Sequence, residues 1–119
     1  MGKPGNTGLA RVIAAAGYSW QGLVAAFRHE AAFRQELAVI VIALPVGVWA
    51  AETTLERVLV VAALLMVLVI ELINSAIEAA VDLWGEQRHE LAGRAKDCGS
   101  AAVLLSIVAA TAVWIGVVF

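Results

Sequence analysis

Residues Glu71 to Asp97, ELINSAIEAAVDLWGEQRHELAGRAKD, continue directly from the apolar run VLVVAALLMVLVI, which ends at Ile70. The first polar side chains therefore occur within the same predicted helix as the apolar, lipid-compatible segment. At helical spacing one face carries a polar stripe, made of Glu71, Asn74, Ser75, Glu78 and Asp82. Because ionisable residues are costly at lipid depth, Glu71 marks a functional-site hypothesis.

The composition is that of a small integral membrane protein. The chain has 119 residues, of which 62% are hydrophobic and only 15% are charged, and its mean hydropathy is +0.90. Since a span needs about 20 apolar residues, this length accommodates three membrane helices with short connections. The net charge is −2 and no polybasic block occurs, so nothing indicates nucleic-acid binding.

The N-terminal region predicts an amphipathic helix at the membrane surface. Residues 1–8, MGKPGNTG, form a lead-in, and residues 9–28 carry apolar side chains three or four positions apart. The aromatic pair Tyr18 and Trp20 and the modest length of this segment favour a position in the interface rather than across the bilayer.

Three membrane spans follow, so we expect an all-α integral membrane fold with the surface helix before them. The predicted spans cover residues 31–51, 55–83 and 98–119. Pro45 is expected to kink the first span. Either Thr53 or Thr54 is expected to cap the second, and Gly85 is placed to end it.

The basic residues predict the topology. Only Arg57 lies on one side of the predicted spans, and the other basic residues lie on the opposite side: Lys3, Arg11, Arg28, Arg34, Arg88, Arg94 and Lys96. The positive-inside rule therefore places the N-terminus in the cytoplasm and Phe119 on the periplasmic side. The polar stripe then faces the cytoplasm.

The stripe suggests a division of chemical roles. Glu71 and Glu78 are about 10 Å apart along a helix axis, too far to share one metal ion. The deeper Glu71 is a candidate general base. The shallower Glu78 is a candidate Mg²⁺ ligand, and Glu30 supplies a second carboxylate at similar depth. Lys96 and Arg94 are candidates to neutralise phosphate charge.

Other interpretations of the same residues stay open at this stage. A solvated interfacial face would account for Glu78, Asp82, Glu86, Glu90 and Asp97. Glu71 and Asn74 could be interhelical hydrogen-bonding groups in a non-catalytic oligomer. Glu71 could also be the membrane carboxylate of a small proton-coupled transporter, although three spans do not give an inverted repeat. Neither GxxxxGK[ST] nor GxGxxG occurs in the chain.

Four segments carry a family resemblance: AAGYSWQGL, EAAFRQE, ELINSAIE and HELAGRAKD. With them the chain resembles the bacterial membrane-integral diacylglycerol kinases. The resemblance implies an inner-membrane homotrimer with active sites shared between subunits. It also implies Mg²⁺-dependent transfer of the ATP γ-phosphate to the primary hydroxyl of diacylglycerol, giving phosphatidic acid. A relative in the same family phosphorylates undecaprenol, which is the alternative acceptor.

The resemblance also implies roles for individual residues. Glu71 matches the general base, supported by Asn74, and Glu30 and Glu78 match the metal ligands. The positions that match the nucleotide site are Arg11, Tyr18, Glu30, Glu78, Gln87, Arg88, His89, Lys96 and Asp97. The positions that match the lipid site are Arg11, Ala16, Ser19, Trp20, Ala32, Phe33, Arg34, Gln35, Glu36, Trp49, Arg57, Glu71 and Ser100. Arg88 departs from the tyrosine of better-known members, and Cys98 replaces a methionine.

Overall fold

The computed structural model describes residues 7–83 and 90–119, and this part of the chain is entirely helical, as predicted. Its helices are α1 (Gly8–His29), α2 (Ala31–Ala50), α3 (Thr54–Asp82) and α4 (Glu90–Val118). Three of them, α2, α3 and α4, are long and apolar enough to cross a membrane. Gly85, the expected end of the second span, lies outside the described residues.

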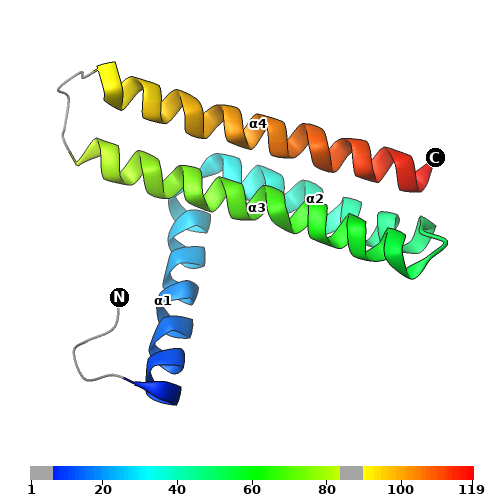
Figure 1. Ribbon diagram of the computed structural model, residues 1–119, viewed down its shortest axis with the longest axis horizontal. Helices are drawn as coiled ribbons and strands as arrows, with labels where there is room; N and C mark the ends of the chain where they lie inside the picture. Colours follow the sequence, from blue (N-terminus) through cyan, green and yellow to red (C-terminus); the bar gives the residue numbers. More distant parts are fainter. Residues whose placement is uncertain (1–6, 84–89) are drawn as a thin grey trace.

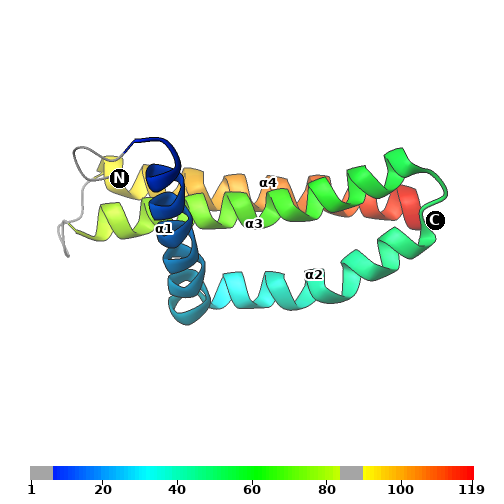
Figure 2. The same cartoon turned by 90° about the horizontal axis from the view of Figure 1, so that it is seen from below.

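The three long helices lie side by side, and α1 leaves one end of them at a steep angle (Figures 1 and 2). Helix α3 packs against both α2 and α4. The buried core lies between these three helices and consists of Ile40, Val60, Leu64, Val67 and Ala110. Most other apolar side chains of the bundle are exposed on its outer surface, as expected of helices that lipid or further chains surround.

Helix α1 is joined to the bundle through its C-terminal end. Glu30 ends α1 and is also the N-cap residue of α2. The Arg34 guanidinium donates hydrogen bonds to the carbonyl oxygens of Phe27 at 2.7 Å and Arg28 at 3.2 Å, which satisfies carbonyl groups that a helix end leaves unpaired. In α1 only Ala26 is buried. A position of α1 on the membrane surface stays a prediction.

The turn between α2 and α3 is fixed by side-chain caps. The Thr53 hydroxyl accepts a hydrogen bond from the Glu56 backbone N–H at 3.1 Å, so Thr53 rather than Thr54 caps α3. The Glu56 carboxylate accepts one from the backbone N–H of Glu52 at 2.8 Å. Arg57 donates to the Ala51 carbonyl at 3.1 Å, which ties the two helices together.

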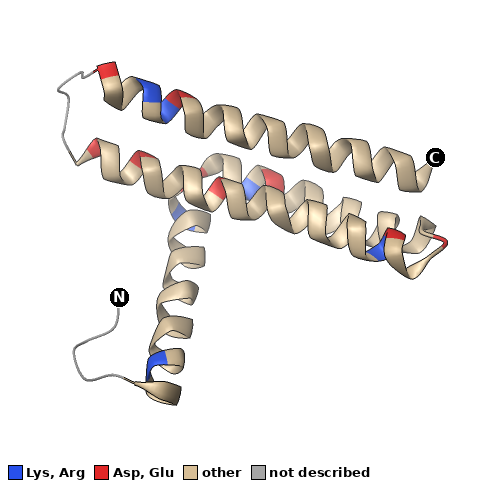
Figure 3. Ribbon diagram, in the orientation of Figure 1, with Lys and Arg blue, Asp and Glu red and all other residues tan. Residues whose placement is uncertain are grey.

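Two features of the long helices refine the expectations. Helix α2 continues through Pro45, and Figure 2 shows it bending toward α3 and α4 in its C-terminal half. Helix α4 begins at Glu90, whereas the sequence places the start of the span at Cys98. Its first turns, which carry Arg94 and Lys96, therefore run beside the end of α3. All the charged residues of α4 lie at this end, beside Glu78 and Asp82 of α3 (Figure 3).

Candidate active site

A pair of carboxyl groups lies between α2 and α3. Glu71 is only 2% exposed, and its side chain is hydrogen-bonded to that of Glu36. A hydrogen bond between two carboxyl groups requires one of them to carry a proton. The second oxygen of Glu36, Oε1, is buried and has no partner among the described residues. The pair therefore offers both a proton acceptor and an unused polar atom.

Asn74 lies one helical turn beyond Glu71 and faces α4. Its side chain is 9% exposed, and its Oδ1 has no hydrogen-bond donor within the described part of the chain. The neighbouring Ser75 hydroxyl is buried and unpartnered in the same way. Buried polar atoms are normally satisfied, so several unsatisfied ones near Glu71 indicate a site that receives a polar ligand.

Further charges continue from this pair toward the end of α3. Glu78 is close enough to Glu30, Glu71, Asp82 and Lys96 to interact with all four electrostatically. The Lys96 ammonium forms an ion pair with Asp82 at 3.0 Å. Two antiparallel helices thus place α4's cation beside the carboxylates of α3, and Glu30 joins them from the junction of α1 and α2.

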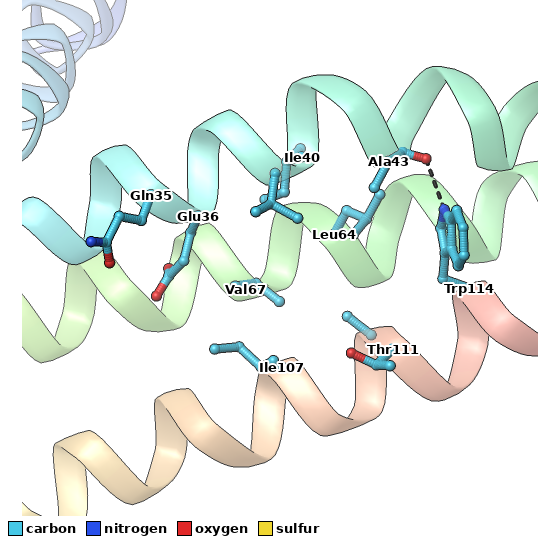
Figure 4. Close-up of a pocket in the computed structure, with 11 residues that line it drawn as sticks. Gln35, Glu36, Ile40, Ala43, Leu64, Val67, Ile107, Thr111 and Trp114 are labelled. Carbon is cyan, nitrogen blue, oxygen red and sulfur yellow. Dashed lines mark hydrogen bonds between the residues drawn. The ribbon is translucent and has the colours of Figure 1, made fainter.

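An apolar groove leads away from the carboxyl pair on the other side. It has a volume of about 410 Å³ and lies between α2, α3 and α4 (Figure 4). Gln35 and Glu36 line one end, whereas Ile40, Leu64 and Val67 contribute to its apolar wall. Trp114 closes the groove at the opposite end, where its indole N–H donates to the Ala43 carbonyl at 2.8 Å. The groove is therefore apolar along its length and polar at the end near Glu36.

Several predicted site residues lie away from this cluster in a single chain. The α1 members are exposed on that helix: Arg11, Ala16, Tyr18, Ser19 and Trp20. Trp49, which is 85% exposed, and Arg57 lie at the α2–α3 turn, the end of the bundle opposite Glu30.

The remaining predicted residues lie on the elements around the cluster. Phe33 is buried, whereas Ala32 and Arg34 are exposed at the start of α2. Asp97 and Ser100 are exposed on α4. The predicted nucleotide residues Gln87, Arg88 and His89 lie outside the described residues.

Comparison with known proteins now identifies the family. Residues 17–118 match the family described as prokaryotic diacylglycerol kinase. The chain belongs to this family. The match covers α2, α3, α4 and most of α1, so the carboxylate cluster and the groove both fall inside the region that defines a prokaryotic diacylglycerol kinase.

Curated relatives agree with this assignment. A diacylglycerol kinase of Escherichia coli (strain K12) is 50% identical over 109 residues, which is 92% of this chain and 89% of the relative. One of Pseudomonas aeruginosa is 46% identical over 110 residues, covering 92% and 89%. One of Haemophilus influenzae is 44% identical over 114 residues, covering 96% and 97%. Diacylglycerol kinases are lipid kinases, and the prediction of a lipid kinase is confirmed at this level.

Kinases of this kind use ATP, and the donor set here fits Mg²⁺. Among the described residues, no three histidine, cysteine, aspartate or glutamate side chains form a group that could hold a metal ion. Glu30 and Glu78, however, interact electrostatically with each other. Mg²⁺ in kinase sites needs only one or two protein carboxylates, because water and substrate phosphates complete its coordination. A carboxylate pair without a third protein ligand suits that requirement.

Three residues acquire roles that the sequence did not assign. Asp82 is the ion-pair partner of Lys96, although the sequence placed it only in the polar stripe. Glu36 was expected to line the lipid site, but its bond to Glu71 was not foreseen. Gly99 packs directly against Asn74. Each of these contacts joins two helices, so helical periodicity within one segment gives no signal for it.

Proposed function

We propose that this chain transfers the γ-phosphate of ATP to the primary hydroxyl of diacylglycerol and so produces phosphatidic acid. The observation that carries the proposal is the hydrogen-bonded pair of the half-buried Glu36 and the buried Glu71 at the polar end of an apolar groove. A lipid with one free hydroxyl has the matching chemistry: acyl chains for the groove and an oxygen for the carboxyl pair. The names of the relatives support the choice of acceptor.

The groove would hold part of an acyl chain. Its walls are apolar side chains of three helices, and its polar residues, Gln35 and Glu36, lie together at one end. An acyl chain that enters this groove brings its glycerol end to Glu36 and hence to Glu71. Holding the reacting hydroxyl in this position accounts for a large part of the barrier reduction in reactions of this type.

Glu71 would act as the general base. It accepts the proton of the lipid hydroxyl as that oxygen attacks the γ-phosphorus, and the bond from phosphorus to the leaving oxygen of ADP breaks. Glu36 keeps the proton that the carboxyl pair shares and donates it in a hydrogen bond to Glu71. Asn74, one turn away, supports the same position. General-base catalysis of this kind contributes about 10²–10⁴-fold in rate.

The nucleotide would bind on the charged side of the cluster. Glu30 and Glu78 would hold Mg²⁺, which neutralises charge on the phosphate oxygens when bound. Lys96 would leave its ion pair with Asp82 and contact a phosphate group, since phosphoryl transfer depends mainly on positioning and electrostatic stabilisation. Asp97 and residues 87–89 complete the proposed nucleotide site.

We further propose a homotrimer in the inner membrane with the N-terminus in the cytoplasm. Positive charges of the described chain lie mainly at the end where α2 begins and α3 ends, which supports this orientation. Arg11, Tyr18 and Trp20 are exposed on α1, where they are available to the cluster of a neighbouring subunit.

The deciding experiment measures ATP-dependent phosphate transfer to lipids by the purified protein, with diacylglycerol and undecaprenol offered in competition. We expect labelled phosphatidic acid from the wild type. We expect Glu71→Gln, which keeps the size and hydrogen bonding of the side chain, to abolish turnover while the protein remains folded. Retained activity would refute the general-base role.

Two other results would redirect the assignment. Preferential labelling of undecaprenol would keep the kinase and change its acceptor. No labelling of either lipid by folded wild-type protein would favour the transporter or packing-subunit interpretation.

A further inference from the structure

The Asn74 amide occupies a space that exists only because residue 99 is glycine. Gly99 is buried on the face of α4 that packs against α3. A Cβ atom at this position would overlap Asn74 Oδ1 and lie 3.2 Å from its Cγ and 3.8 Å from its Cβ. The whole side chain of Asn74 thus faces the Cα of Gly99, and no other described side chain is as close to that position.

The amide oxygen rests against this packing surface and not on a hydrogen-bond donor. Its Oδ1 is buried without a donor in the described part of the chain, and the residue is 9% exposed. An amide oxygen that no donor fixes takes its direction from the surface it rests on. For Asn74 that surface is the bare backbone of α4 at Gly99.

We propose that Gly99 is a positioning residue of the kinase, which sets the direction of the Asn74 amide and, through it, the geometry beside Glu71. The inference rests on the proposed function, because it assumes that Asn74 takes part in the site. A methyl group at residue 99 would force the amide to rotate away from α4. Since Asn74 is only three residues from Glu71 on the same helix, the displacement would occur next to the proposed base.

The test compares Gly99→Ala with two other glycine-to-alanine variants. A Cβ at Gly93, also on α4, meets nothing within 4 Å, so Gly93→Ala controls for the methyl group itself. A Cβ at Gly47 would lie 2.7 Å from Val60 Cγ1 and 3.1 Å from Cδ1 and Nε1 of Trp114, so Gly47→Ala controls for crowding that does not involve Asn74.

We expect Gly99→Ala to lower kcat about 10- to 100-fold, the range that a small misplacement in an active site produces. The KM for ATP should stay within about twofold, because the nucleotide charges are not displaced. Gly47→Ala should lower the melting temperature in detergent, and any loss of kcat that it causes through Trp114 should be the same with and without the Asn74 amide. Gly93→Ala should change neither quantity.

A double-mutant cycle separates positioning from general damage. In an Asn74→Ala background there is no amide to displace, so adding Gly99→Ala should lower kcat less than about twofold. The same cycle should be measured on the melting temperature. Gly99→Ala should lower it less in the Asn74→Ala background than in the wild type, because the overlap with the amide is gone. An equal loss of kcat in both backgrounds, or no loss in the wild-type background, would overturn the proposal.

The result also distinguishes this inference from the proposed function. If Glu71→Gln is inactive but Gly99→Ala is fully active, only the positioning role is wrong. If Glu71→Gln is active, the general-base assignment is wrong. If Asn74→Ala keeps full turnover, Asn74 has no role in the reaction and the positioning role of Gly99 is overturned with it.

Discussion

The Glu36–Glu71 pair makes a prediction about stability that is independent of turnover. Glu36→Leu removes the hydrogen-bond partner of a carboxyl group that is 2% exposed. Leaving a buried polar group unpaired costs about 1–3 kcal/mol. Glu71→Leu leaves the Glu36 carboxyl unpaired, at a smaller cost because Glu36 is only half-buried. We therefore expect each single substitution to destabilise the protein, and the double substitution to be close to neutral, since it leaves no unpaired group.

The size of the coupling follows from the surroundings. Leucine gains little from burial here, because lipid tails are as apolar as leucine, so the unpaired carboxyl dominates each single variant. Interhelical hydrogen bonds in membranes average about 0.6 kcal/mol with a maximum near 1.7. The near-complete burial of Glu71 places this pair at the upper end of that range. We expect a coupling free energy of about 1–2 kcal/mol between the two positions.

The assay is reversible unfolding in mixed micelles by titration with sodium dodecyl sulfate, followed by circular dichroism, for the wild type and three variants. Gln35→Leu is the matched control, because Gln35 lines the same groove but is exposed, and it should change stability by less than about 0.5 kcal/mol. A double variant whose loss equals the sum of the single losses would refute the reasoning, since additivity means that the two carboxyl groups do not interact.

Two further predictions concern contacts at the two ends of the bundle. Trp114→Phe removes the indole donor to the Ala43 carbonyl and should cost about 1 kcal/mol in the same unfolding assay, whereas Trp49→Phe, at an 85% exposed position, should cost nothing measurable; equal effects would contradict this. Asp82→Asn breaks the ion pair with Lys96, whose side chains are 63% and 42% exposed, and should lower stability by less than about 1 kcal/mol at low salt. That loss should disappear at 1 M salt, where screening is strong, and a loss that persists would show that the pair is not electrostatic.

Most of the fold follows from hydropathy and helix punctuation. The apolar runs gave three spans, and a threonine before the second gave its cap, because both signals are local. The start of α4 at Glu90 was not evident. In the sequence, charged residues such as Arg94 and Lys96 suggest a link between spans. In the structure they belong to α4, because its first turns extend beyond the apolar segment and pack beside the end of α3. How far a helix continues beyond its apolar segment depends on its packing against neighbouring helices, which hydropathy does not report.

The sequence was enough to name candidate residues of the site, but it did not show which of them contact one another. Depth alone identified Glu71 and Asn74 as exceptional, and the structure buries both. Periodicity could not show that Glu36 reaches Glu71 or that Gly99 makes space for Asn74, because each contact depends on how two helices are rotated about their axes. Within the described part of one chain, the exposed positions on α1 and Trp49 lie away from the carboxylate cluster, and their roles stay predictions.

The length of α3 would let one helix serve both the lipid and the nucleotide of the proposed reaction. Its 29 residues extend about 43 Å at 1.5 Å per residue, whereas the hydrocarbon core is about 30 Å thick. We place the excess at the C-terminal end, where Glu78 and Asp82 follow the buried Glu71, because charged side chains are costly in lipid. A rigid helix fixes the separation along its axis between Glu71, the proposed base, and Glu78, the proposed metal ligand, at about 10 Å. Helix α4 matches this projection with Lys96, and its glycine at position 99 lets it approach α3 where the two environments meet. In the proposed mechanism, the depth at which phosphate meets a lipid hydroxyl is therefore determined by helix packing.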